Sequence, residues 1–534
     1  MNVSNRDPEP KPFDVKRRRL RFLGLTIDDT IQAFFGGNAL VAVVILALIT
    51  IFLFREGFGF FAQDRLNLEV YRRAGLEYVS YIKEQTDDHT ALTRYLSDLR
   101  TRQLSLLLEQ KHRSLEEANA DLAKFDAFAD EVGASVDQLR ALASELTETA
   151  SAIKTKFFVG EDKKEERRQL LAEGKSAAAA AVKIEGIDFA SELKPILATL
   201  PLYRETSRDF SRKLMATLDR CPTLDEAKLQ LRMDRFKELT RQYVAGFPEV
   251  ERRLSVWDPM LPVTFGQSIR SFVSGRQWLT ASFWQDWYGI LPLLSGSLMV
   301  SLVALTLAVP LGVGAAVYVN QIATPREQRL IKPGIEFISA VPSVVLGFFG
   351  IVVLGQALRT LAKQSWLAWV PGFPYSERLN IITAGCLLAL IALPTIFTLA
   401  EDALHNVPRS LPEASFALGA SRLQTIIRIV IPASFSGIIS AALLGFGRVI
   451  GETMVVLLCA GNRIAIPDFT QGLAVFVQPV HTLTGIIAQE MGEVVRGSIH
   501  YRALFVVGLL LFVLSLMINY AAQIIVRRYR ISVG

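Results

Sequence analysis

Six stretches of the chain are apolar enough and long enough to cross a lipid bilayer as helices. A bilayer core of about 30 Å is crossed by roughly 20 apolar residues in helical conformation. The stretches that meet this requirement are Phe34–Phe54, Ile290–Val319, Ile335–Leu358, Ile381–Ala400, Ser434–Ala460 and Ala503–Val526. The pattern predicts an all-α integral membrane protein with six spans, in which a long polar segment follows the first span.

That polar segment carries a heptad pattern typical of packed helices. Its apolar positions alternate at spacings of three and four residues and are broken only at Lys111, which predicts one helix over Leu104–Phe157, about 80 Å long. Segments 163–184 and 224–245 are expected to fold back on its apolar stripe, with self-association through the stripe as the alternative. Breaks are expected near Gly160, Pro195, Pro201 and Pro222. The stripe consists of Leu104, Leu108, Leu115, Ala118, Leu122, Phe125, Ala129, Val132, Val136, Leu139, Ala143, Leu146, Ala150, Ile153 and Phe157.

Charge is distributed unevenly between these two parts. Residues 62–285 hold 35 acidic and 34 basic residues, whereas residues 287–534 hold only 10 acidic and 16 basic residues. The chain's net charge of +6 therefore comes from the flanks of the spans, and it does not indicate a nucleic-acid-binding surface. Three scattered cysteines indicate neither a disulfide framework nor a metal cluster, and no cofactor is expected.

Basic residues in the short flanking segments predict the orientation, because cytoplasmic flanks are enriched in Lys and Arg. The first span has no small-residue cleavage site after Arg55-Glu56 and is interpreted as an uncleaved anchor. Both termini are then predicted to be cytoplasmic, and the polar segment extracytoplasmic. One side holds sixteen basic residues, namely Arg6, Lys11, Lys16, Arg17, Arg18, Arg19, Arg21, Arg326, Arg329, Lys332, Arg409, Arg422, Arg428, Arg527, Arg528 and Arg530. The other side holds six, namely Arg359, Lys363, Arg378, Arg463, Arg496 and Arg502.

The loop Glu401–Pro432 contains a spaced motif on the side predicted to be cytoplasmic. Glu413-Ala414 is followed by Gly419 and then by Ile429-Val430-Ile431-Pro432. A short helix is predicted here, ended by Gly419, where a left-handed residue can turn the chain. This resembles the EAA loop of ABC importer permeases, with Ser415 in place of the second Ala and Ile431 in place of Leu. An ordinary connecting helix is the alternative. The resemblance implies that Glu413, Ala414 and Gly419 contact a separate ATPase subunit.

The chain further resembles the PstC-type permease subunit of phosphate-specific ABC importers. The resemblance is carried by the segments Phe272–Trp278, Glu336–Gly347 and Gly445–Met454, and it covers the first span and about 266–534. Leu346 departs from the Tyr that is frequent in the family. The G-E-T-M sequence at Gly451–Met454 favours PstC over the sister PstA subunit.

Arg448 and Glu452 are charged residues within the predicted fifth span. They are four residues apart, which predicts one helix face, on which Glu452 can pair with Arg448. Charges at this depth are costly unless they face water or each other. A structural ion pair is the alternative to a role in transport. The resemblance favours a substrate path containing Arg448, Glu452 and Thr453, in which the guanidinium fork suits phosphate oxygens.

The sequence thus predicts four regions. They are a basic cytoplasmic segment (1–33), a first transmembrane anchor (34–54), an extracytoplasmic, coiled-coil-like helical domain with its connector (55–285) and a five-span permease core (286–534). A Walker A loop is not expected at Gly174-Lys175, because Gln169 stands where the first glycine is needed. Hydrolysis is therefore assigned to a partner, and the chain itself is not expected to be an enzyme.

The resemblance implies a phosphate import system in the inner membrane. Its other components would be a PstA-like permease, a PstB-like ATPase dimer and a PstS-like phosphate-binding protein, with membrane lipid around the spans and no nucleic acid. A permease for molybdate or sulfate is one alternative. A transporter-like protein whose outer domain senses and signals is the other.

Overall fold

The computed structural model describes residues 21–22, 25–109, 111–184, 186–280, 284–367, 369–370, 372–375 and 377–528. Most of the predicted basic segment, as well as Arg530, lies outside these residues. The described chain is almost entirely helical, which confirms the all-α prediction. Its strands are two short antiparallel pairs, β1 (Arg21–Phe22) with β2 (Leu25–Thr26) and β3 (Trp278–Leu279) with β4 (Trp287–Tyr288).

Six helical segments in the described residues are long and apolar enough to cross a membrane, as predicted. The first belongs to α1 (Ile27–Arg73), which continues well beyond the predicted end at Phe54. The second joins α12 (Leu291–Val317) to η1 (Tyr318–Ile322). The others are formed by α14 (Ser343–Phe349), η2 (Gly350–Leu354) and α15 (Gly355–Ala362), by α16 (Ile381–His405), by α18 (Arg422–Thr425), η4 (Ile426–Val430) and α19 (Ile431–Ile450), and by α22 (Ile499–Arg528).

Two predicted spans have the wrong limits. The stretch Ile335–Leu358 is divided at Pro342, because α13 (Pro325–Ala340) ends before this proline and α14 begins after it. The stretch Ser434–Ala460 is divided at Gly451–Thr453, between α19 and the short α20 (Met454–Cys459). Hydrophobicity alone does not reveal these breaks, since the residues on both sides are apolar.

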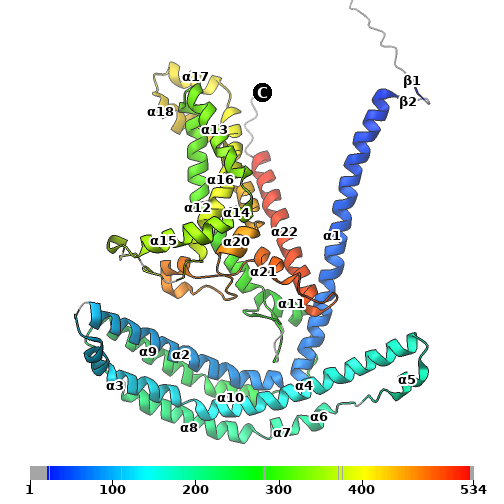
Figure 1. Ribbon diagram of the computed structural model, residues 1–534, viewed down its shortest axis with the longest axis vertical. Helices are drawn as coiled ribbons and strands as arrows, with labels where there is room; N and C mark the ends of the chain where they lie inside the picture. Colours follow the sequence, from blue (N-terminus) through cyan, green and yellow to red (C-terminus); the bar gives the residue numbers. More distant parts are fainter. Residues whose placement is uncertain are drawn as a thin grey trace, which may run out of the picture.

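The remaining elements of this membrane core (residues 291–528) are short. They are η3 (Ser365–Leu367), α17 (Ser410–Ala417), η5 (Phe469–Val477) and α21 (Leu483–Glu490). Figure 1 shows α17 and α18 at the same end of the molecule as the start of α1 and the end of α22. The polar helices that follow α1 form a crescent at the opposite end.

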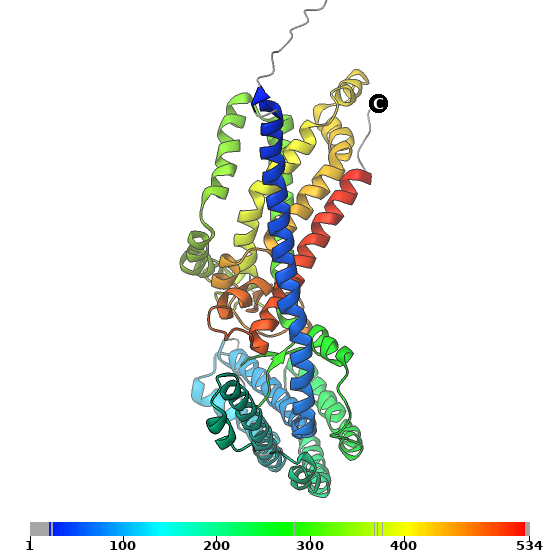
Figure 2. The ribbon, with the colours of Figure 1, turned by 90° about the vertical axis from the view of Figure 1, so that its right-hand side faces the viewer.

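This crescent is the inserted domain, residues 76–255. Its main helices are α2 (Leu76–Glu109), α3 (Leu115–Ala134), α4 (Asp137–Ala172), α8 (Leu200–Asp219), α9 (Ala227–Ala245) and α10 (Phe247–Ser255). Three one- or two-turn helices, α5 (Ser176–Ala181), α6 (Phe189–Glu192) and α7 (Lys194–Leu197), connect α4 to α8. Figure 2 shows α1 running without interruption from the membrane core into this domain.

Most of the heptad stripe is buried as predicted, except Leu115, which is exposed, and the stripe does not lie on one helix. Val132, Leu139 and Ile153 are fully or almost fully buried in one core with residues of α8 and α9, and Leu122 is buried in a smaller cluster with Ala118. The chain turns between α2 and α3, where Ser114 and Glu117 form a capping box and Lys111 lies in the turn. A second turn separates α3 from α4. The predicted 54-residue helix is therefore wrong, since local capping divides it into three.

The predicted partners of the stripe are half correct. The segment 224–245 packs on α2 through α9, with Met233 and Phe236 buried. Residues 163–172, in contrast, continue α4 through Gly160 and do not fold back. The prolines at 195, 201 and 222 lie at or near helix ends as predicted.

The inserted domain and the end of α1 both contact the connector (residues 256–290) that leads into α12. Lys154 Nζ donates to the carbonyl oxygen of Trp284 at 2.9 Å and to Gln285 Oε1 at 3.0 Å. The rings of Tyr71 and Trp287 meet edge to face with centroids 5.2 Å apart. The connector also contains α11 (Phe265–Ser274), which packs on α1. The domain is thus attached both to the first span and to the entry of the second.

We expect residues 62–265, expressed alone, to be soluble and strongly helical, because the buried stripe finds its partners within the fragment. Circular dichroism and size-exclusion chromatography measure both properties. A fragment that is mainly unstructured or aggregated would show that this domain needs the membrane core to fold.

His89 makes the stability of this domain sensitive to pH. Its ring is fully buried, with Nε2 3.0 Å from the carbonyl oxygen of Val132. Burial lowers the pKa of His89 more than this hydrogen bond raises it. The unfolded chain therefore takes up a proton at a higher pH than the folded domain, and this contribution reduces the free energy of unfolding as the pH falls below about 6.5.

His89→Gln should remove this part of the pH dependence between about pH 7.5 and pH 5. Urea unfolding of the fragment, followed by circular dichroism at both pH values, measures it. His112→Gln is the matched control, since His112 is exposed in the turn before α3. Equal pH dependence in wild type and His89→Gln would contradict the assignment.

Candidate functional site

The first candidate site lies at the break after α19. Arg448 is on the last turn of this helix, which ends at Ile450, whereas Glu452 follows the helix end. Arg448 and Glu452 therefore do not share a helix face, and that prediction is wrong. The end of α19 at Ile450 and Gly451 separate them.

Arg448 is directed away from the rest of the chain. Its side chain is exposed, and Nη1 donates a hydrogen bond to Thr395 Oγ1 on α16 at 3.1 Å. Neither Glu452 nor any other carboxylate in the described parts of the chain forms an ion pair with it. An unpaired cation within a span is costly in lipid, so this position calls for water or another protein subunit beside it.

Glu452 instead stabilises the break. Its Oε1 accepts a hydrogen bond from the backbone N–H of Met454 at 3.2 Å, at the start of α20. Its carbonyl oxygen accepts one from Thr484 Oγ1 at 2.7 Å. Thr453 precedes α20, and its hydroxyl lies 3.5 Å from the carbonyl oxygen of Gly451. The expected pairing of Glu452 with Arg448 is thus replaced by contacts with the backbone.

A small polar cavity adjoins this break. It has a volume of about 10 Å³, enough for one water molecule at most. Hydroxyl groups of α12, of the N-cap of α21 and of α21 itself line it together with Glu452, namely Ser297, Ser301, Thr482 and Thr484, and apolar side chains form the rest of the wall. The cavity itself is therefore no passage for a solute in this conformation.

Sequence reasoning missed these hydroxyls and Thr395. The signal was present as Thr482 and Thr484 in an otherwise apolar run and as Thr395 directly after Pro394. Ser297 is fixed in position because its Oγ accepts the backbone N–H of Leu483 at 2.8 Å.

The second candidate site is the surface of α17. Glu413 lies in the first turn of this helix and Ala414 beside it, both exposed. Gly419 follows the helix with φ of +82°, as its predicted role in a left-handed turn requires. Leu418 is 90% exposed and Phe416 is 48% exposed, so the helix presents apolar side chains with no cover in the described chain.

Two contacts attach the loop that carries α17 to neighbouring elements of the membrane core. Ser415, the departure from the motif, has its hydroxyl 2.9 Å from Thr425 Oγ1 and so joins α17 to α18. Arg422 donates to the carbonyl oxygen of Gln321 in η1. The surface of α17 is therefore fixed to the ends of the second and fifth spans.

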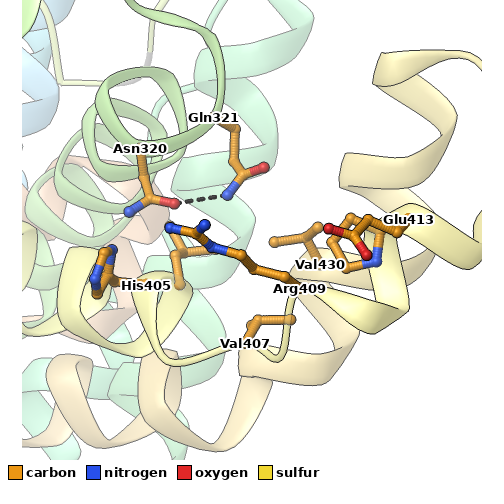
Figure 3. A pocket seen from close by; sticks show the side chains of 9 residues that line it. Asn320, Gln321, His405, Val407, Arg409, Glu413 and Val430 are labelled. Carbon is orange, nitrogen blue, oxygen red and sulfur yellow. Dashed lines mark hydrogen bonds between the residues drawn. The ribbon is translucent and has the colours of Figure 1, made fainter. Parts of the chain in front are cut away.

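A cavity of about 290 Å³ opens beside Glu413. In Figure 3, Arg409 extends toward Asn320 and Gln321, whose side chains are hydrogen-bonded to each other at 2.6 Å, while Glu413 lies on the other side. The cavity is polar and open, and it is formed at the junction of η1, α16 and α17. It could receive a side chain of a docked partner.

Comparison with known proteins decides the family. Residues 308–531 match the model described as "Binding-protein-dependent transport system inner membrane component". A probable ABC transporter permease protein, YqgH, of Bacillus subtilis is 34% identical over 249 residues, which cover 46% of this chain and 75% of YqgH. The chain belongs to this permease family.

Two relatives specify the type. The PstC 1 phosphate transport permease of Mycobacterium tuberculosis is 31% identical, covering 45% of this chain and 73% of that protein. PstC of Mesorhizobium japonicum is 29% identical, covering 50% of this chain and 83% of that protein. The chain is thus a permease of the PstC type, and the predicted resemblance is confirmed.

The family match contains both candidate sites. It begins within α12 and includes α17, α19 and the break at Glu452, whereas the inserted domain lies outside it. The chain is therefore a multi-pass membrane permease of the ABC-transporter type.

Gly296 provides a test of the polar cavity's packing. A Cβ at this position on α12 would lie 2.1 Å from the carbonyl oxygen of His481, which is backbone and cannot move aside alone. Gly296→Ala should displace the segment that carries Thr482 and Thr484, lower the stability of the assembled permease by about 1–3 kcal/mol, the usual cost of overpacking, and reduce its transport activity.

Gly314→Ala is the matched control on the same helix, because no atom lies within 4 Å of its added Cβ. Thermal melting of the purified permease and a transport assay measure both variants. Wild-type stability and activity in Gly296→Ala would refute this packing.

Proposed function

We propose that this chain is the permease subunit of an ATP-driven phosphate importer and forms one side of the transport path. The observation that carries the proposal is Arg448, an unpaired cation at the exposed surface of a transmembrane helix. The names of the PstC relatives support phosphate as substrate. Molybdate or sulfate, which are also oxyanions, are the alternative.

The path would lie between this subunit and a PstA-like second permease. Arg448 would supply the fixed cation, whose planar fork of donors matches tetrahedral oxyanions. Glu452 and Thr453 would line the path at the break, where Glu452 already holds the start of α20. The exposure of Arg448 supports this placement, because a second subunit would cover it with a water-filled passage.

A PstB-like ATPase dimer would dock on the surface of α17. Glu413, Ala414 and Gly419 would contact the ATPase, and the exposed Phe416 and Leu418 would be buried by it. The contacts of α17 with α18 and of Arg422 with η1 would pass the movement of the ATPase to the spans. A PstS-like phosphate-binding protein would deliver the substrate, and membrane lipid would surround the remaining surfaces.

The orientation that we propose has both termini in the cytoplasm and residues 55–285 in the periplasm. The regions would be the basic segment 1–33, the anchor 34–54, the periplasmic domain with its connector and the core 286–534. Figure 1 is compatible with this division, since α17 and the start of α1 lie at one end and the inserted domain at the other.

Arg448→Ala should abolish ATP-coupled phosphate uptake without preventing assembly, because it removes the cation of the path but touches no docking surface. Arg448→Lys should also be impaired, since it keeps the charge but loses the fork of donors. Uptake of radioactive phosphate into proteoliposomes that contain the assembled transporter measures the effect.

Arg428→Ala serves as the control, because Arg428 is another exposed arginine of the same apolar segment. It should retain uptake. Wild-type uptake by an assembled Arg448→Ala transporter would sink the proposal for the path, and selective uptake of sulfate or molybdate by the wild type would reassign the substrate.

Glu413→Lys or Gly419→Asp should reduce co-purification of the ATPase subunit or uncouple hydrolysis from transport. Each places an unsuitable charge or a strained side chain in the proposed contact. Pull-down of the ATPase and the ratio of phosphate transported to ATP hydrolysed measure the two effects.

Glu336→Lys is the control for charge, since Glu336 is exposed on α13 rather than on α17. Unchanged ATPase retention together with unchanged coupling in the Glu413 and Gly419 variants would place the dock elsewhere.

A further inference from the structure

A second cavity lies between the inserted domain and the membrane core, far from α17. Its volume is about 810 Å³, within the range of small-molecule sites. Three separate parts of the chain form it, namely α2 of the inserted domain, the β3 region of the connector and the loop after α20. The inserted domain therefore completes a cavity that the membrane core alone would leave open.

Two cations line this cavity. Lys83 comes from α2 of the inserted domain, and Arg276 comes from the connector. The part of the chain that the structure describes contributes no carboxylate to the lining, and within it neither cation forms an ion pair. Two unpaired cations facing one cavity repel each other, and an anion between them would relieve this repulsion.

The side chain of Lys83 and the backbone that carries Arg276 are held in place. Lys83 Nζ lies 4.9 Å from the centroid of the Trp284 ring, a cation–π distance. Arg276 projects from a backbone that is fixed by the hydrogen bond from Gly289 N–H to the carbonyl oxygen of Gln277, at 2.8 Å. A Cβ on Gly275 would lie 2.6 Å from the Cα of Gly289, so the two strands approach as closely as only glycines allow.

The remaining wall is rigid and largely apolar. The Trp278 indole is buried, and its Nε1 donates to Glu490 Oε2 at 3.2 Å. Glu490 also lies 2.7 Å from His500 Nε2, so this carboxylate, which holds Trp278, is engaged by a second group. Leu291, the first residue of α12, and Ile464 complete the apolar wall. Because a membrane span begins at Leu291, the cavity lies at the level where lipid headgroups meet water.

We propose that this cavity binds a phosphate group between Lys83 and Arg276. The group can belong to free inorganic phosphate on its way to the transport path or to the headgroup of an anionic phospholipid. Only the first source rests on the proposed function. Gln277 adds a neutral donor, and Trp278 and Leu291 shape the cavity around the group or its lipid chain.

The experiment uses the assembled transporter in lipid nanodiscs without ATP. Binding of radioactive inorganic phosphate is measured in discs of phosphatidylcholine, in an Arg448→Ala background that removes the proposed cation of the path. Retention of phosphatidylglycerol is measured by native mass spectrometry after reconstitution in mixed discs. The variants are Lys83→Gln and Arg276→Gln, with Lys83→Arg to restore the charge and Arg235→Gln, an exposed cation of α9 outside the cavity, as the control.

Lys83→Gln and Arg276→Gln should each weaken the binding of one of the two ligands about tenfold or more, which is the effect of losing one charged hydrogen bond. Lys83→Arg and Arg235→Gln should bind that ligand as the wild type does. Weaker inorganic phosphate binding identifies the free ion, and lower phosphatidylglycerol retention identifies the lipid headgroup. If neither phosphate binding nor phosphatidylglycerol retention changes in these variants, the proposal is wrong. This holds even if the variants bind a phosphate-binding protein more weakly. Phosphate uptake by the wild-type transporter is assayed separately, so failure of the proposed function is recognised independently.

Discussion

Polar groups inside a bilayer must find their partners within the protein, because hydrocarbon offers none. This constraint governs the membrane core wherever a span is interrupted. At Gly451–Thr453 the carboxylate of Glu452 accepts the N–H of Met454, and Thr484 donates to the carbonyl oxygen of Glu452. Ser297 accepts the N–H of Leu483 across from them. The break is stabilised by the side chain of Glu452 itself and by the hydroxyl of Thr484 from α21.

Arg448 is the exception to that rule, and the exception is informative. Its single hydrogen bond to Thr395 leaves most of its donors unused. A buried structural ion pair would have satisfied them from within the chain. The side chain instead is exposed at the surface of the described chain. An unsatisfied cation at this position is what the proposed path between two permease subunits requires.

The sequence predicted those features that depend on composition and on local pattern. Apolar length identified six spans, and the heptad spacing identified the buried residues of the inserted domain, such as Leu122 and Leu139. The left-handed turn at Gly419 followed from its position after a short helix. Each of these properties is determined by residues close together in the chain.

The errors arose where distant residues decide the outcome. Arg448 and Glu452 have helical spacing, yet the helix ends between them. The hydroxyl of Thr484, which is remote in sequence, donates a hydrogen bond to the carbonyl oxygen of Glu452 that the helix end leaves free. The long heptad helix was divided by the capping box at Ser114, whose polar residues the periodicity did not weigh. The hydrogen bond from Lys154 to the carbonyl oxygen of Trp284 in the connector joins residues 130 positions apart, and no local pattern indicates such a contact.

The unbroken course of α1 has a mechanical consequence. Its 47 residues form a rod of about 70 Å, at 1.5 Å per residue, that begins beside the spans and ends in the inserted domain. It rests on α22 near its middle, where Arg502 Nη1 donates to the carbonyl oxygen of Gly59 and the Phe52 and Phe505 rings meet. A rod supported near its middle acts as a lever. A tilt of a few degrees about this support would move the far end of α1, about 30 Å away at 1.5 Å per residue, by about 2–3 Å.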